Sequence, residues 1–554
     1  MKESQKVQIN FLFIIPFPSP NPKTIMSELL TVISIEPIDT SRKDPSPTPL
    51  LNPPCIVSDN SSRVPLDVED GGLKKGRIII IITALTGVNF LASLSNGFIT
   101  IGLPRIASDL SLPDGLLIWP SAVYFLTSSS CLLVAGSVAD VIGTRRINLA
   151  GCFLVSVFIL ACGFARTGIE LIMFRAMQGI AVSLCLPTSV AIVANSVPSG
   201  RKRNIGFSCL GFVQPIGFSL GMVLEGVIVD TVGWRLSYYL SGSLSLAFFI
   251  LSLWVLPRDA VIERSVLVRI RKEIDWVGAV MASTSLGVFS YILATLTSTI
   301  TNIRQPPNIV LLVLSIALIP AFILWENRRE RFNLPALIPN SFWRNTVFTS
   351  VCFAILFSNA VTNAMELFCS LFFQNVQQTS ALGASTRILP SLLVAFFVQL
   401  TTGLIVHRTN PYRLVLACLC LSTGAPLLMA LISPHWPYWY AAFPAQLLAP
   451  VACDIMFTIG LLAVSEEFPS HTQALAGAVF STVAQFGTSL GLTVIAVVAA
   501  AVTNSKVDQG KGRAEELLAG YRAGFWAQFS WMGLACLIGA FGLRKMGRVG
   551  VKRD

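Results

Sequence analysis

A series of long apolar stretches constrains this chain more than any other feature. It begins near residue 78 and continues almost to the C-terminus. Each stretch holds about 20 residues, enough for a helix to cross the ~30 Å hydrocarbon core of a bilayer and satisfy its own backbone hydrogen bonds there. We therefore predict an all-α polytopic membrane protein with fourteen transmembrane helices, over 78–103, 116–138, 147–166, 169–195, 204–228, 235–256, 275–297, 307–325, 346–368, 383–406, 412–432, 438–463, 474–500 and 523–543.

Composition excludes a water-soluble fold of this size. Only 12% of the residues are charged and 53% are hydrophobic, whereas a soluble domain carries roughly 25% charged residues. The net charge of +11 would suit nucleic-acid binding, but the Lys and Arg residues lie in short clusters between the apolar stretches. Membrane proteins distribute their positive charge in this way. We expect the lipid bilayer as a partner, and no nucleic acid.

The same charges predict the orientation of the helices. An even number of spans puts both termini on one side of the membrane. If that side is the cytosol, the cytosolic segments hold 24 Lys and Arg residues and the other side holds 8. Because this bias stays in register through every loop, it supports both the span count and cytosolic termini. We expect the plasma membrane, with the vacuolar membrane as the alternative.

Loop lengths predict the domain organisation. The longest cytosolic loops, 257–274 and 326–345, bracket spans seven and eight, which indicates six helices, a two-helix insert and six more. The N-terminal segment is rich in Pro and Ser and favours disorder; Met26 is an alternative start that would make residues 1–25 an extension. The predicted parts are a disordered cytosolic tail (1–76), an N-terminal bundle (77–257), loops with the insert (258–345), a C-terminal bundle (346–545) and a short cytosolic tail (546–554).

The loop between the second and third spans carries the pattern G-x-x-x-D-x-x-G-x-R-R, formed by Gly136, Asp140, Gly143, Arg145 and Arg146. Glycines permit a tight turn and a close approach of helices. Asp140 lies at a helix end within reach of basic groups, a pairing that could hold one conformation and break in another; the alternative is a solvated turn. The pattern resembles the signature loop of the major facilitator superfamily. That resemblance implies two bundles that rock about a central cavity, with this loop as a conformational latch.

The fourth span carries Arg175 about six residues inside an apolar helix, with Gln178 one turn away on the same side. An arginine is costly in lipid, so it should face the bundle or a cavity; the alternative is a side chain that snorkels to the interface. The pair matches the R-x-x-Q-G motif of the same superfamily, where the arginine is implicated in proton coupling. The resemblance gives Arg175 that role.

The fifth span places Gly217, Gly221 and Glu225 on one stripe, with Gly226 beside it. Small residues let a neighbouring helix pack closely. The stripe resembles the antiporter motif of the export branches, although Met222 stands where Pro is usual and Glu225 where Gly is usual. Glu225 is either a substrate or proton group, or an interfacial residue that reaches water.

The seventh span opens with Asp275, Trp276 and Gly278. Asp can cap a helix and Trp favours the membrane interface. The pattern D-W-x-G-A also resembles the opening of span seven in the fourteen-helix drug:proton antiporters. Residues 214–221 and 520–522 resemble the fungal aminotriazole-resistance and boron-exporter branch of that family most.

One departure from that family bears on proton coupling. Its members often carry an aspartate in helix 1, and here Ser95 lies in the corresponding stretch. If a proton is carried, another group must take it. The candidates are Asp454, deep in span twelve, and Glu366, near the outer end of span nine, because an ionisable residue at depth is a functional-site hypothesis. A carboxylate paired for structure is the alternative.

No phosphate-binding loop, serine-hydrolase, metalloprotease or calcium-loop pattern occurs, and the twelve cysteines and three histidines form no metal-ligand spacing. We therefore predict no enzyme, no cofactor and no metal. The leading hypothesis is a monomeric, proton-coupled exporter of drugs, toxic compounds or secondary metabolites. The runner-up is a proton-coupled importer of a siderophore, vitamin or ammonium-like nutrient, and a transporter-like nutrient sensor is a third reading.

Overall fold

The computed structural model describes most of the membrane part of the chain. Residues 1–74 of the predicted N-terminal tail, the alternative start at Met26 and the predicted C-terminal tail lie outside the described residues, and helix α1 already begins at Lys75. Those residues form helices joined by turns and loops, with no strand among them. They are 75–197, 201–259, 269, 274–296, 305–332, 334, 336–405, 409–468, 472–507 and 512–545.

Fourteen helical segments in this part are long and apolar enough to cross a membrane, which confirms the predicted number. The first six are α1 (Lys75–Asp109), α2 (Trp119–Ile142), α3 (Thr144–Phe164), α4 (Gly168–Ser196), α5 (Arg201–Thr231) and α6 (Arg235–Val255). The next are α8 (Trp276–Leu296) and α9 (Pro306–Arg331), followed by the short α10 (Ser341–Arg344). The last are α11 (Thr346–Leu371), α12 (Ala381–Ile405), α13 (Pro411–Leu431), α14 (Ala442–Leu448), α15 (Val451–Glu467), α16 (Gln473–Val507) and α17 (Arg513–Gly542).

Span twelve differs from the continuous helix expected over 438–463. It consists of two helices, α14 and α15, separated at Ala449 and Pro450. Proline has no amide hydrogen and breaks the helical hydrogen-bond ladder. The break lies inside the apolar segment, where an unsatisfied backbone group needs a partner from a neighbouring helix.

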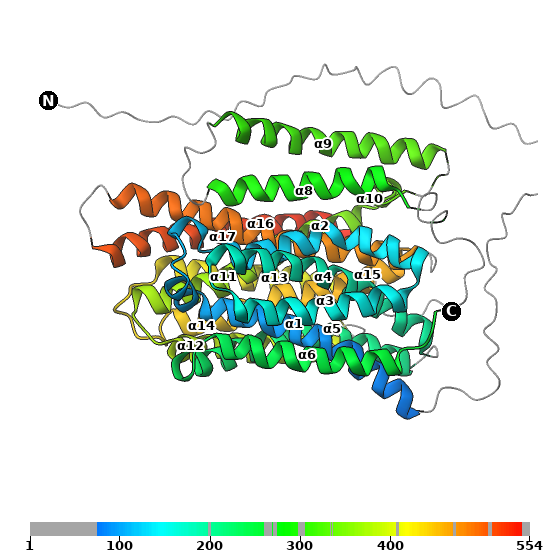
Figure 1. The fold of residues 1–554 in the computed structure, drawn as a ribbon. Helices are drawn as coiled ribbons and strands as arrows, with labels where there is room; N and C mark the ends of the chain where they lie inside the picture. Colours follow the sequence, from blue (N-terminus) through cyan, green and yellow to red (C-terminus); the bar gives the residue numbers. More distant parts are fainter. Residues whose placement is uncertain are drawn as a thin grey trace, which may run out of the picture. The chain divides into compact units, whose positions relative to one another are not determined.

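The helices pack as two groups with an appended pair (Figure 1). Helices α1 to α6 contact one another most, and α11 to α17 form the second group. Helix α8 packs on α2 and α16, while α9 packs on α8 at the edge of the molecule (Figure 1). The segment of α9 that would cross the membrane is only 6% buried, so lipid would cover most of it.

We call the end that carries Arg145, Arg258 and Arg344 the basic end, and the other the opposite end. At the opposite end, one hydrophobic core runs through both groups of helices, from Phe98 in α1 to Phe368 in α11. At the basic end the core divides. One part lies among α1, α4, α5 and α6, and the other lies mainly among the C-terminal helices. The two groups are therefore sealed together at the opposite end.

Candidate transport site

Arg175 lies fully buried in α4, with its guanidinium held by α1 and α2. Nε donates to the carbonyl of Pro120 at 3.0 Å, Nη1 to the side-chain oxygen of Gln178 at 3.0 Å, and Nη2 to the side-chain oxygen of Asn96 at 2.5 Å. The carbon of the guanidinium lies 4.6 Å from the ring centre of Tyr124, a cation–π contact. The side chain therefore faces the bundle, and the snorkelling alternative does not hold.

Ser95 of α1 completes the set of groups around the guanidinium, which we call the cage. Its hydroxyl accepts from Gln178 at 2.6 Å and from Arg175 at 3.4 Å, and donates to the carbonyl of Ala92 at 2.8 Å. The stretch of helix 1 in which drug:proton antiporters often carry an aspartate thus lies directly against the arginine. In this chain neutral acceptors bind the guanidinium at that point.

A small hollow lies between the two groups of helices, directly next to the cage. Asn96 is shared, because it both accepts from Arg175 and lines the hollow. The volume is about 10 Å³, room for roughly one water molecule. In this conformation the hollow therefore has no room for a small organic molecule. The lining consists of amides, hydroxyls and apolar side chains: Asn96, Ile99, Thr100, Ser121, Phe125, Phe218, Asn363, Leu367 and Leu492.

Two carboxylic acids lie in the C-terminal group, and one of them is next to this lining. Glu366 of α11 is buried, and Asn363 and Leu367 on the same helix line the hollow. Glu366 interacts electrostatically with Asp454 of α15. Both candidates that the sequence proposes therefore lie in the C-terminal group, and we refer to them together as the acid pair.

Asp454 owes its position to the break in span twelve. It lies in the first turn of α15, where the helix dipole favours a negative charge. Its buried Oδ2 has no hydrogen-bond partner within the described residues. Ser422 of α13 closes the break: its hydroxyl donates to the carbonyl of Leu448 at 2.8 Å and accepts from the amide of Ala452 at 2.9 Å.

Glu225 of α5 is fully buried, which excludes the alternative of an interfacial residue that reaches water. Neither oxygen of its carboxyl has a hydrogen-bond partner among the described residues. Gly102 of α1 lies against this carboxyl, because a Cβ there would come within 2.7 Å of Oε1. Glu225 thus lies against α1 at Gly102 and against α6 at Ser237.

The glycines of the α5 stripe make the close contacts that the spacing predicts. A Cβ on Gly217 or Gly221 would run into the backbone of α1, at the carbonyls of Phe90 and Leu94. Gly226 faces Ser385 of α12, in the other group of helices. Gly217 and Gly221 therefore join α5 to α1, and Gly226 joins it to the C-terminal group.

The turn between α2 and α3 is bound by a carboxylate that sequence reasoning missed. Asp259, which follows α6, accepts from the amides of Arg145 at 2.9 Å and Arg146 at 3.2 Å, and so caps α3. Gly143 has φ of +119°, and a Cβ there would collide with Asp259. Asp140 is exposed. Asp259 comes 116 residues after Gly143, so no local spacing could have revealed the contact.

Gly136, the first glycine of this pattern, lies in α2, where a Cβ would meet only Pro187 of α4, at 3.9 Å. The close approach of helices therefore does not depend on this glycine.

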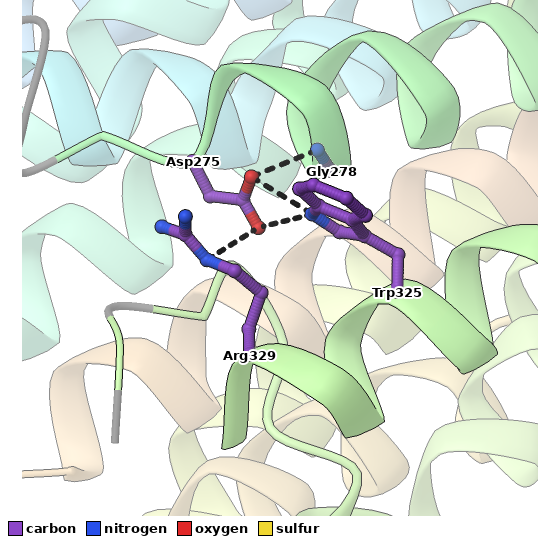
Figure 2. Close-up of polar contacts among 4 residues, drawn as sticks. All are labelled: Asp275, Gly278, Trp325 and Arg329. Carbon is purple, nitrogen blue, oxygen red and sulfur yellow. Dashed lines mark hydrogen bonds and ion pairs between the residues drawn. The ribbon is translucent and has the colours of Figure 1, made fainter. Parts of the chain in front are cut away.

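Asp275 explains the pattern that opens span seven (Figure 2). Its carboxylate caps α8 by accepting from the amide of Gly278 at 3.0 Å, as the sequence predicts. It also accepts from the indole of Trp325 at 3.1 Å and pairs with Arg329 at 3.6 Å. Trp325 and Arg329 are four residues apart on α9, so they share one face. Asp275 therefore ties α9 to α8, while Trp276 is exposed.

Two helical groups that share a small hollow, in fourteen apolar helices with a buried arginine, are typical of a polytopic membrane transporter. A family model described as Major Facilitator Superfamily matches residues 85–492, and the chain belongs to that superfamily. This assignment places it among transporters and not among enzymes.

Known proteins resemble the chain over most of its length. MFS-type transporter 1 of Pyricularia oryzae is 38% identical over 526 residues, 86% of either chain. The aminotriazole resistance protein of Saccharomyces cerevisiae is 26% identical, with 79% of each chain covered. A bacterial homologue of the human lysosomal transporter Spinster, solved inward-facing and occupied, has a TM-score of 0.60 at 15% identity and covers 85% of this chain and 98% of its own. At 15% identity, the likeness to the Spinster homologue shows a shared fold and nothing further.

Proposed function

We propose that this protein exports small toxic compounds, drugs or secondary metabolites in exchange for protons, by alternating access. The hollow between the two groups of helices carries the proposal, because residues of both groups line it and a core common to both seals one end. A relative named for aminotriazole resistance supports export. The sealed end would be the extracellular one.

The proposed coupling groups lie on either side of the hollow. Arg175 and Gln178 stand on the N-terminal side, with Asn96 between them and the hollow. Glu366 and Asp454 stand on the C-terminal side. Protonation of the acid pair would remove a buried negative charge, and so change the relative stability of the two conformations.

The lining of the hollow suggests the chemistry of the cargo. Amides and hydroxyls supply a few hydrogen bonds, and Phe125 and Phe218 supply apolar surface, the usual composition of a site for small organic molecules. We propose a monomer in the plasma membrane with both termini in the cytosol, consistent with the excess of Lys and Arg in the predicted cytosolic segments.

The test is an accumulation assay in cells that lack their own exporters. Cells expressing the protein should hold less of at least one member of a labelled panel that includes aminotriazole. Collapse of the pH gradient and Asp454→Asn should each abolish the difference, whereas a Glu515→Gln control, at the exposed start of α17, should not. Raised accumulation would establish import, and a difference that survives collapse of the gradient would exclude proton coupling.

A further inference from the structure

Three neighbouring polar groups in the N-terminal half are buried without partners. Neither oxygen of the Glu225 carboxyl has a hydrogen bond among the described residues, and neither do the hydroxyls of Ser237 and Tyr238 in α6. All three residues are at most 1% exposed. Buried polar groups are nearly always paired, so three orphans in one place indicate something that the protein chain alone does not supply.

The three groups belong to one small site. Ser237 approaches the Glu225 carboxyl, without a well-aligned hydrogen bond. Tyr238 interacts electrostatically with the same carboxyl. Gly102 of α1 provides the space, because a Cβ there would lie 2.7 Å from Oε1. The site thus draws on α1, α5 and α6, and its carboxyl stands where the antiporter motif usually has glycine.

Charge in the surroundings does not stabilise an ionised Glu225. Among the described residues, the titratable group that interacts with it is Tyr238 of α6, which also interacts with Cys162 of α3 and Arg175 of α4. The guanidinium of Arg175 is already held by neutral acceptors. The carboxylate of Asp230, further along α5, accepts a hydrogen bond from the amide of Leu382 in α12. An ionised carboxylate that is buried without a partner costs far more free energy than the neutral acid. In this conformation the acid form is therefore the one that fits.

The site lies beside the seam between the two groups of helices. The next residue, Gly226, packs on Ser385 and the carbonyl of Ala381 in α12. One turn further, Asp230 accepts from the amide of Leu382 at 2.9 Å. Separation of α5 from α12 would bring water to this part of α5. Closure would exclude that water again.

We propose that Glu225, Ser237 and Tyr238 form a proton-binding site in the N-terminal half, which takes up a proton from water when the opposite end opens and retains it when that end closes. Glu225 binds the proton on a carboxyl oxygen, and the two hydroxyls position it. This proposal rests on the proposed function in one respect: transport would move the proton that the site binds. The binding itself is measurable without a substrate.

Infrared spectroscopy of the purified full-length protein tests the site directly. A protonated carboxylic acid has a carbonyl stretch that an ionised carboxylate and a glutamine lack. Around neutral pH we expect the acid band of the wild type to lose one component in Glu225→Gln and none in Glu515→Gln, a control at an exposed acid of α17. Tyr238→Phe should retain the band at a shifted frequency, because it removes a dipole beside the carboxyl.

Gly102→Ala is a second variant that leaves the carboxyl in place. Its Cβ would force Oε1 to move, so the Glu225 band should shift. Three outcomes would overturn the assignment: an identical acid band in the wild type and Glu225→Gln, a Glu225 signal that is an ionised carboxylate around neutral pH, or loss of the band when sodium chloride replaces choline chloride at fixed pH. The last result would make it a sodium site. Loss of transport with the band intact would instead count against the proposed function alone.

Discussion

Arg175 depends on the planar fork of its guanidinium, because Nε, Nη1 and Nη2 each bind a different neighbour. Lysine offers a single nitrogen and cannot reproduce that geometry. We expect Arg175→Lys to abolish the accumulation difference. It should also lower thermal stability, since each lost hydrogen bond of a charged group costs about 1.5–3 kcal/mol. Arg166→Lys, at an exposed arginine before α4, is the control. Equal activity of the two variants would contradict a special role for the cage.

Asp275 holds three groups with one carboxylate, and only one of them belongs to its own helix. We expect Asp275→Asn to retain the cap of α8 and to lose the ion pair with Arg329. Hydrogen exchange should then rise at the α9 amides around Trp325, because α9 has few other contacts. Glu330→Gln, next to Arg329 on α9, should leave exchange unchanged. Unchanged exchange in Asp275→Asn would mean that other contacts hold α9, among them the hydrogen bond from Ser285 of α8 to the carbonyl of Ser315.

Helix α5 offers a matched pair of glycines. A Cβ on Gly221 would collide with the backbone of α1 at Leu94, whereas a Cβ on Gly211 meets nothing within 4 Å. We expect Gly221→Ala to destabilise the protein by about 1–3 kcal/mol, as overpacking does. Gly211→Ala should be neutral or stabilising by about 0.5–1 kcal/mol, the gain of alanine over glycine in a helix. Thermal unfolding followed by size-exclusion chromatography compares them; equal melting temperatures would refute the close α1–α5 contact.

The broken span depends on a serine from another helix. Ser422→Ala removes the partner of both the Leu448 carbonyl and the Ala452 amide, and each buried group left unsatisfied costs about 1–3 kcal/mol. Ser252→Ala is the control, since that buried hydroxyl only binds its own helix at Phe248. We expect a lower melting temperature for Ser422→Ala than for Ser252→Ala. The reverse order would show that the break is stabilised by other means.

Hydropathy predicted the fourteen spans because each must match the thickness of the bilayer, and that requirement is local. The break at Pro450 escaped prediction because its repair comes from Ser422, on a different helix. The sequence left two interpretations of Glu225 open for a similar reason. The sequence indicates how deep Glu225 lies along α5. It does not indicate that Gly102, on another helix, lies against the carboxyl. The contact of Asp259 with the α2–α3 turn could not be predicted for the same reason.

Polar contacts join the two groups of helices at the opposite end. The Asp230 carboxylate accepts from the amide of Leu382 at the start of α12, and the Gln374 side chain donates to the carbonyl of Ile101 at 3.0 Å. The carboxylate also favours the N-terminal end of the α12 dipole, an effect of about 0.3–1 kcal/mol. Asp230 therefore stabilises the state in which this end is closed.

Asp230→Asn should consequently shift the population of the open form about two- to fivefold, the ratio that this free energy corresponds to. Spin labels at Val232 and Gln378, in a background without native cysteines, would report the separation of the two groups. We expect a larger fraction of long distances in Asp230→Asn. Arg105→Gln, which breaks only an exposed ion pair within α1, should not change the distribution. If both variants match the parent, the shared apolar core alone keeps this end closed, and the cap on α12 has no part in the conformational equilibrium.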